Sequence, residues 1–480
     1  MAVDRRLEVA RNCGILIPDN LITETDILLW ANLQGCHYTK AGTSRLSLNV
    51  NSPKQLAYKE WIDLQFGLVD QLKIPGLYEV CDITSPFETS PLSPKPDSAS
   101  LSIVLFGQFR IPSNSRVMKN NVVVKIGFSD KDPTVDNSLS IERKLYPILM
   151  NELYHKRVCP HIVIYLGALE CNDVAYALKQ YADAGNLHAK NMIKRVTKLQ
   201  NPYLGKPDSR LFQNRYNPHS MHWLILEKTQ GKTLLKWITE KTGNGGNLYD
   251  SVAVDLCTIL FQILYTLVSF DKIGVMHNDL HLGNIFVDLM PKRFSINYKV
   301  NSVVYNVTTD IHCKVYDFDR AEKHATPTSP SVTGPNNALD LFGLCNFICV
   351  CKGKFVKNLD LLKFLIGVRA AMGDNQFNID LFYRMIGTDT TKPLGELIED
   401  YADGDTYYYP CATIGGNKVL DPRFTALPTT VYYDIITNGL IPFSDGLGKE
   451  IHLNSLVPSP PGLTKPPAWK YHSDFTWEIK

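Results

Sequence analysis

The stretch that decides the fold is Val275–Val287, which reads VMHNDLHLGNIFV. It follows the most apolar run of the chain, Leu256–Phe270, and ends in three strand-forming residues. A polar loop between a buried helix and a strand can turn Asp279 and Asn284 toward one cavity. An aspartate there can accept the proton of a hydroxyl group, and an asparagine oxygen can bind a hard cation. The stretch therefore predicts a polar site at the end of a core helix.

A second segment, Val315–Arg320 (VYDFDR), begins 31 residues after Asn284. Its Asp317 follows a strand-like run, so the carboxylate is expected at a strand end. Mg²⁺ prefers oxygen ligands and is commonly shared between one or two carboxylates and substrate phosphates. The two segments together predict a magnesium site made by Asn284 and Asp317.

In order and spacing, these segments resemble the H-R-D-x-x-x-x-N and D-F-G motifs of eukaryotic-type protein kinases. The resemblance implies an α+β fold with two lobes, a β-rich N-lobe and a helical C-lobe, and implies ATP and Mg²⁺ as cofactors. Asp279 would orient and deprotonate the acceptor hydroxyl, while Asn284 and Asp317 would hold Mg²⁺. His281, which stands two residues after that aspartate, would contact the transferred phosphate.

The resemblance also predicts an upstream lysine and its glutamate. Lys125, at the end of Val122–Lys125 (VVVK), would bind the ATP phosphates. Glu142 is the best candidate to hold that lysine from a helix, and Glu152 is the alternative.

Three further positions follow from the same resemblance. Leu226 and Glu227 would form the entry to the interlobe hinge that binds adenine, with Leu226 as gatekeeper. Gly107 would belong to a reduced glycine loop at Leu105–Arg110. Asp340 would brace the backbone of the catalytic loop from the start of a helix.

The chain divides into three expected parts. Residues 1–95 form an N-terminal extension that ends in a Ser- and Pro-rich linker, residues 96–228 the N-lobe, and residues 229–480 the C-lobe with a Pro-rich tail. Insertions are expected at about residues 170–220 and at residues 289–312.

Apolar periodicity predicts the main elements around these motifs. Strands are expected at Leu101–Phe109, Val122–Phe128, His161–Leu166 and Trp223–Glu227, and helices at Ser138–Tyr154, Thr233–Lys241 and Leu256–Phe270. The last helix is expected to be a buried core helix, too short to span a membrane.

The segments also depart from the family pattern. Only one glycine lies near the expected phosphate loop, which argues for a catalytically inactive fold used as a binding or virion scaffold. Asn278 replaces the arginine of H-R-D, so activity is not expected to need loop phosphorylation. Asp319 replaces the glycine of D-F-G, which makes a positive φ there less accessible. The interval of 23 residues from Asp317 to Asp340 predicts a short activation segment.

Composition bears on the partners and the cellular compartment of the protein. A formal net charge of +2 gives no argument for nucleic acid or an anionic membrane as a partner. Eleven scattered cysteines favour a reducing, intracellular compartment over a secreted disulfide framework. The N-terminus lacks the apolar core of a signal peptide. The sequence leaves the oligomeric state open.

The expected function is that of a serine/threonine protein kinase that acts on a protein substrate. His281 gives a haspin-like H-x-D-x-H-x-x-N loop, which small-molecule phosphotransferases also carry, so that class remains an alternative beside the inactive scaffold. The D-F-D form and the insertions resemble kinases of large DNA viruses, which implies host cytoplasm or virion as the location.

Overall fold

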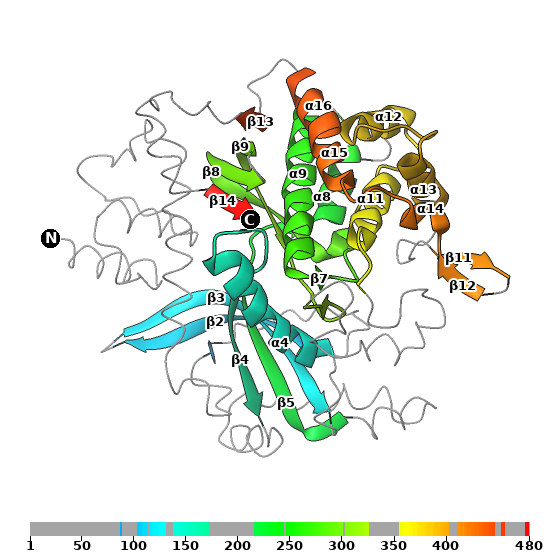
Figure 1. Cartoon of the computed structure of the whole chain (residues 1–480). Coiled ribbons are helices and arrows are strands. Elements are labelled where there is room, and N and C mark those ends of the chain that lie inside the picture. The colour runs from blue at the N-terminus through cyan, green and yellow to red at the C-terminus, as the bar shows by residue number, and fades with distance from the viewer. Residues whose placement is uncertain are drawn as a thin grey trace, which may run out of the picture. The chain divides into compact units, whose positions relative to one another are not determined.

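The computed structural model describes residues 87–88, 103–113, 116–130, 138–171, 216–243, 246–248, 250–300, 303–325, 355–402, 411–415, 417–446, 453–456 and 476–479. The fold is mixed α+β, and the chain forms two compact units (Figure 1). The first unit contains residues 1–143 and 164–228, and the second contains residues 144–163 and 229–480. The chain passes between them at Lys228, where the lobe boundary is expected, but residues 144–163 group with the second unit.

The first unit is built on one antiparallel sheet of five strands. Its spatial order is β1 (Phe87–Glu88), β2 (Ile103–Ser113), β3 (Arg116–Asp130), β5 (Tyr216–Glu227) and β4 (Tyr165–Cys171). Val124 of β3 and its partner Ile225 of β5 lie on the same face of the sheet, and both are buried. The expected strands at 122–128 and 223–227 are confirmed, each as part of a longer strand. The strand expected at 101–109 is confirmed from Ile103 on, and residues 101–102 lie outside the described residues.

The expected loop at Leu105–Arg110 is wrong. All six residues lie inside β2, paired in continuous register with β3, and Gly107 stands opposite Val122. A residue in such a ladder directs its backbone groups toward neighbouring strands. Gly107 is therefore part of a strand and not of a loop, and its contact with phosphate stays a prediction.

The strand expected at His161–Leu166 is also wrong in its first half. β4 begins at Tyr165, and the preceding residues follow the end of β9 (Val303–Val315) instead. Val315 N donates to His161 O at 2.9 Å, and Val163 N donates to Val315 O at 3.0 Å. The His161 ring is buried, with Nε2 2.8 Å from the Tyr298 hydroxyl, which fixes this segment within the second unit.

The helix expected at Ser138–Tyr154 exists in two parts. α4 (Ser138–Leu149) continues into a π-helical turn at Met150–His155. Pro147 lies inside α4 and cannot donate a backbone hydrogen bond, which weakens regular α-helical bonding at this end. The division between the two units falls within α4, after Arg143.

The central element of the second unit is α9 (Asp250–Ile273) (Figure 1). With 24 residues it is longer than expected, so the argument that it is too short for a membrane span is wrong. By length and composition, Ser251–Ile273 is the one described helix that qualifies as a candidate span, and 78% of the apolar 18-residue window within it is buried inside the structure. Gln262 also binds the backbone of β9, with Nε2 2.9 Å from Ile311 O and Oε1 2.7 Å from Cys313 N. Burial and these contacts are those of a core helix.

A second sheet of five strands lies beside α9 (Figure 1). Its order is β13 (Leu453–Leu456), β9, β8 (Ile285–Val300) and β14 (Thr476–Ile479), and β6 (Lys232–Thr233) also pairs with β8. Residues 289–312, expected as an insertion, thus belong mostly to two long paired strands. They extend the sheet far enough for both C-terminal strands to join it.

The other elements complete the second unit. A two-stranded pair of β7 (Val275–Met276) and β10 (Glu322–Lys323) flanks the polar loop. The described helices are α8 (Leu234–Thr242), α11 (Leu359–Ala371), α12 (Gln376–Met385), α13 (Pro393–Ala402), α14 (Pro422–Thr425), α15 (Val431–Asp434) and α16 (Ile441–Gly446), with a hairpin of β11 (Cys411–Ile414) and β12 (Asn417–Leu420). Thr233 caps α8, and its hydroxyl accepts from Lys236 N.

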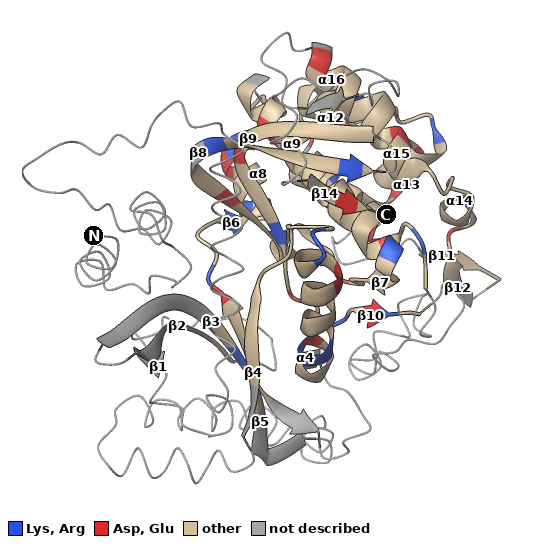
Figure 2. Ribbon diagram, turned by 60° about the vertical axis from the view of Figure 1, so that its left-hand side comes forward, with Lys and Arg blue, Asp and Glu red and all other residues tan. Residues whose placement is uncertain are grey.

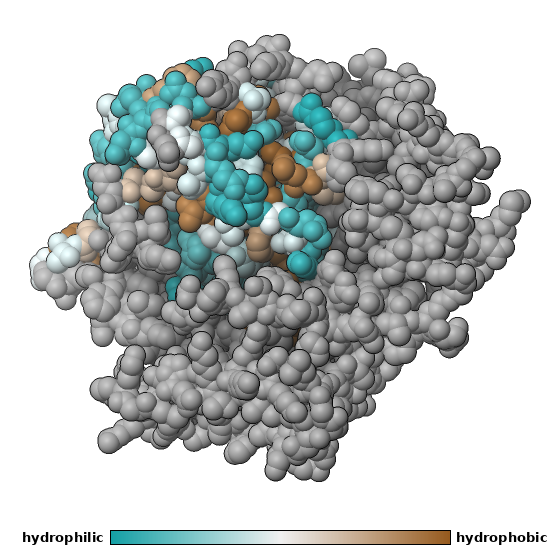
Figure 3. Space-filling view, turned by 180° about the vertical axis from the view of Figure 1, so that it is seen from behind, coloured by the Kyte–Doolittle hydropathy of each residue, from teal (hydrophilic) through white to brown (hydrophobic). Residues whose placement is uncertain are grey.

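The described surface of the second unit is mixed in character. Charges of both signs lie on β8, β9 and β14, and Lys299 Nζ is 2.8 Å from Glu478 Oε1 (Figure 2). Figure 3 shows small hydrophobic areas between hydrophilic ones. The exposed large apolar side chains of the described residues lie on separate elements, namely Leu235, Leu289, Phe377, Ile414 and Val419.

The half-buried carboxyl of Asp271 is expected to limit stability at neutral pH. Burial raises the pKa of Asp271, at the end of α9, to about 7. The unfolded chain loses this proton near pH 4, so the folded state loses stability as the pH rises from about 4 to about 7. Asp271→Asn is expected to raise the free energy of unfolding by about 2 kcal/mol at pH 8.

Urea unfolding at several pH values tests this expectation. The gain from Asp271→Asn should shrink toward pH 4, and the exposed Asp374→Asn should show no such trend. A gain that is independent of pH would contradict the assignment.

Candidate functional site

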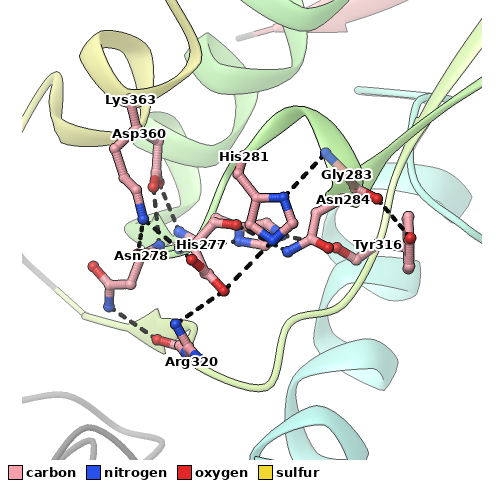
Figure 4. Close-up of polar contacts among 10 residues, drawn as sticks. His277, Asn278, His281, Gly283, Asn284, Tyr316, Arg320, Asp360 and Lys363 are labelled. Carbon is pink, nitrogen blue, oxygen red and sulfur yellow. Dashed lines mark hydrogen bonds and ion pairs between the residues drawn. The ribbon is translucent and has the colours of Figure 1, made fainter. Parts of the chain in front are cut away.

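The predicted site of the second unit centres on Asp279, which lies between two cations (Figure 4). Lys363 Nζ, from α11, is 3.2 Å from Asp279 Oδ1, and Arg320 Nη1 is 3.1 Å from Asp279 Oδ2. Lys363 also donates to the Asn278 carbonyl at 3.1 Å. Both carboxylate oxygens are therefore held in fixed directions.

Asp360, in the first turn of α11, braces the loop that carries Asp279. Its Oδ2 accepts from His277 N at 2.7 Å, and its Oδ1 accepts from Asn278 N at 2.9 Å (Figure 4). The resemblance to protein kinases implied Asp340 for this brace, a residue that lies outside the described residues. That attribution is wrong, because Asp360 receives both hydrogen bonds.

Burial raises the pKa of the Asp360 carboxyl, and the charge of His277 and the two backbone hydrogen bonds offset only part of that rise. The position near a helix N-terminus also favours a negative charge.

Asn284 is tied to the same loop. Its Nδ2 donates to the Asp279 carbonyl at 2.9 Å, which turns Oδ1 to the other side of the amide (Figure 4). Tyr316 N donates to Asn284 O at 3.1 Å, and the Tyr316 hydroxyl donates to Gly283 O at 2.6 Å. These bonds hold the residue before Asp317 directly against the Asn284 loop.

Two residues of the predicted segments adopt the left-handed backbone region. Asn278 has φ 62° and Asp317 has φ 66°, two of the four described non-glycine residues with positive φ. Such a residue costs about 1–2 kcal/mol, least for Asn and Asp. Asp319, which replaces the glycine of D-F-G, is not one of them. The strain is located at Asp317, whose side chain is a predicted magnesium ligand.

Two histidines have defined tautomers in this loop. His281 Nδ1 accepts from Gly283 N at 3.0 Å, so its proton is on Nε2, which lies 3.9 Å from Asp279 Oδ2. Burial lowers the pKa of His281 more than the charges of Asp279 and Asp317 raise it, which keeps the ring neutral at pH 7. His277 Nε2 donates to Tyr316 O at 2.9 Å and thereby links the two segments.

Aromatic rings pack around Phe318, the residue after Asp317. Phe318 is fully buried, and its ring centroid is 4.8 Å from that of His277, 5.2 Å from that of Tyr146 and 5.8 Å from that of Phe270. The residue after Asp317 is thus anchored in the core.

The charge of Asp279 is well compensated. Burial raises the pKa of its carboxyl, but the positive charges of Lys363 and Arg320 together outweigh burial and bring the pKa below its usual value. Asp279 is therefore ionised at neutral pH and able to accept a hydrogen bond from a hydroxyl group.

In the first unit, the structure brings together the predicted lysine and glutamate. Lys125 Nζ, on β3, is 2.7 Å from Glu142 Oε2, on α4, and the Glu142 side chain is only 1% exposed. Glu152, the alternative, pairs with Lys156 at 2.6 Å. The buried carboxylate fixes the direction of the lysine.

Leu226 and Glu227 end β5, directly before the chain leaves the first unit. Leu226 is buried, and Glu227 is bound twice to Ile164. Glu227 N donates to Ile164 O at 2.9 Å, and Glu227 Oε1 accepts from Ile164 N at 2.8 Å. The end of this strand is thereby rigid.

The oxygen donors of Asn284 and Asp317 suit Mg²⁺ if substrate phosphates supply further ligands. Asn284 and Asp317 supply hard oxygen atoms, and the described residues contain no group of three or more His, Cys, Asp or Glu that could hold a metal by themselves. Mg²⁺ commonly binds one or two protein oxygens together with substrate phosphates. The donor set suits a cation that is completed by a bound nucleotide.

Lys363, Arg320 and Asp360 were missed or misassigned from sequence. Asp360 had a readable signal, since Leu359–Leu361 repeats the Leu-Asp-Leu of Leu339–Leu341. No local pattern places Lys363 or Arg320 beside Asp279, because those contacts join distant parts of the chain.

Neither a protein-family model nor a curated protein matches the chain.

Proposed function

We propose that the chain is an ATP-dependent phosphotransferase of the protein-kinase type that transfers the γ-phosphate of Mg-ATP to a Ser or Thr hydroxyl of a protein. The observation that carries this proposal is the arrangement around Asp279. An ionised carboxylate is held by Lys363 and Arg320, and Asn284 is bonded to its backbone.

Each residue has a role in this proposal. Asp279 would accept the proton of the acceptor hydroxyl, and the Nε2–H of neutral His281 would contact the transferred phosphate. Asn284 and Asp317 would hold Mg²⁺, which when bound neutralises phosphate charge.

Residues of the first unit would hold the nucleotide. Lys125, fixed by Glu142, would bind its phosphates, and Leu226 and Glu227 would lie beside adenine. Phosphoryl transfer depends mainly on positioning and charge stabilisation, which these groups could supply.

The corrected brace favours a protein acceptor over a small molecule. The short activation segment predicted from the interval between Asp317 and Asp340 would favour a small-molecule acceptor over a protein. Since Asp360 is the bracing residue, the interval becomes 43 residues. A segment of that length has room to contact an extended peptide.

The proposal is tested by transfer of labelled phosphate from ATP to a generic protein acceptor. The wild-type chain should transfer phosphate in the presence of Mg²⁺, and Lys125→Met should reduce the rate about 100-fold because it removes a charge from the phosphates. Lys144→Met, at an exposed position of α4, is the matched control and should change the rate little.

Stability must be checked because Lys125→Met leaves the buried Glu142 without its cation. The double variant Lys125→Met/Glu142→Gln should recover the lost stability but not the transfer. Mg-ATP that raises the melting temperature of a wild-type chain without transfer would contradict the proposal and favour the inactive scaffold.

A further inference from the structure

The two cations on Asp279 differ in how accessible they are. The Lys363 side chain is 2% exposed and also bound to the Asn278 carbonyl, whereas the Arg320 side chain is 28% exposed. Lys363 is thus a buried support of the carboxylate. Arg320 is the cation that a ligand arriving from solvent can reach.

The backbone of Arg320 is fixed next to Asp279. Asn278 Nδ2 donates to Arg320 O at 3.0 Å (Figure 4). The fully buried Phe318 anchors the chain two residues before Arg320. The long side chain beyond this anchor can change rotamer while its Cα stays in place. Arg320 can therefore exchange one anion for another without moving the loop.

Arg320 occupies the oxygen that an acceptor hydroxyl needs. Lys363 lies on Oδ1 of Asp279, so Oδ2 is the more accessible oxygen, and Arg320 Nη1 is 3.1 Å from it. A hydroxyl that binds Oδ2 competes with the guanidinium. A neutral acceptor would break the ion pair between Arg320 and Asp279 without offering the guanidinium a new anion. An acceptor that carries its own anion would give Arg320 a new charge-assisted contact.

We propose that Arg320 is a specificity-determining residue that selects acceptors carrying an oxyanion, carboxylate or phosphate, next to the acceptor hydroxyl. The inference rests on the proposed function. When the hydroxyl binds Asp279, the guanidinium turns from Oδ2 to the neighbouring oxyanion. Arginine suits this exchange because its planar fork binds carboxylate and phosphate through two parallel hydrogen bonds.

The first test compares peptide acceptors that differ only in charge. Peptides with Asp-Ser-Asp, Asn-Ser-Asn and phosphoserine-Ser-phosphoserine centres are assayed for kcat/KM. The wild-type chain should prefer a charged peptide over the neutral one by about tenfold, the size expected for one partly buried charge-assisted contact. A preference for Asp only or for phosphoserine only identifies the source of the oxyanion.

Variants at Arg320 then test the residue itself. Arg320→Gln should bring the ratio of charged to neutral kcat/KM close to one, and Arg320→Lys should restore part of it. A merely structural role would lower both values equally and leave the ratio unchanged. A wild-type ratio near one, or an unchanged ratio in Arg320→Gln, would overturn the inference while leaving the proposed function intact.

A binding measurement tests the oxyanion site at Arg320 independently of the proposed phosphotransferase activity. Fluorescence anisotropy of a labelled Asp-Ala-Asp peptide, which cannot be phosphorylated, needs no catalysis. Binding by the wild-type chain that weakens about tenfold in Arg320→Gln supports the oxyanion site even if no transfer occurs. Equal binding of Asp-Ala-Asp and Asn-Ala-Asn peptides by the wild-type chain overturns it.

Discussion

Asp279→Asn is expected to reduce phosphate transfer by about 10²- to 10⁴-fold, the usual contribution of a positioned general base. The amide cannot accept the hydroxyl proton, and it removes the negative charge between Lys363 and Arg320. Geometry should change little because an amide oxygen can still accept from Lys363. The measurement is the initial rate of labelled phosphate transfer at saturating Mg-ATP.

Two controls make the Asp279 result specific. Asp380→Asn removes a carboxylate from the exposed face of α12 and should leave the rate unchanged. Mg-ATP should still raise the melting temperature of Asp279→Asn, because Asp279 is not a predicted magnesium ligand. Equal transfer by Asp279→Asn and wild type would exclude Asp279 as the base.

Asp360→Ala is expected to lower the free energy of unfolding by about 3–5 kcal/mol. The change leaves the backbone N–H groups of His277 and Asn278 buried without an acceptor, and each such loss costs about 1–3 kcal/mol. The strained Asn278, with φ 62°, also depends on this acceptor. Urea unfolding measures the loss, and transfer activity should fall with it as the loop loses its geometry.

The matched variant for Asp360 is Asp340→Ala, which removes the aspartate of the competing Leu-Asp-Leu sequence. It should destabilise much less than Asp360→Ala. Asp360→Asn should be intermediate, since an amide keeps one acceptor but places a donor against the second N–H group. A larger loss from Asp340→Ala than from Asp360→Ala would contradict the brace described here.

Helix α11 explains why Asp279, Asp360 and Lys363 act as a group. Asp279, Asp360 and Lys363 share one buried region, and Lys363 lies one helical turn after Asp360 on α11. The helix thus delivers a carboxylate to the loop backbone and an ammonium group to the loop side chain. A change at either position is expected to affect both contacts.

Several features of this protein followed from local sequence. The apolar run before Val275 specified a buried helix, and the polar loop and the strand after it specified the order helix, loop, strand. The resemblance to protein kinases implied the pairing of Lys125 with Glu142, and the two side chains form an ion pair.

Where local patterns were ambiguous, prediction failed. Residues 105–110 resembled a loop because of Gly107, yet pairing with β3 keeps them in a strand. Local patterns also gave no sign of the pairing of residues 289–312, which were expected as an insertion: they lie mostly in β8 and β9, which β13 and β14 join from more than 140 residues further along the chain. Neither partner strand can be recognised from the sequence of the segment it joins.

The sequence by itself determined the chemical groups of the site, Asp279, Asn284 and Asp317, and their order, because a loop between a helix and a strand is specified by neighbouring residues. Only the tertiary structure decided that Asp360 braces the loop and that Lys363 and Arg320 compensate Asp279. Two Leu-Asp-Leu sequences have the same local propensity, and only long-range packing of α11 selects one. The charge environment of a carboxylate is a property of neighbours in space, which the chain brings together from positions 41 and 84 residues away.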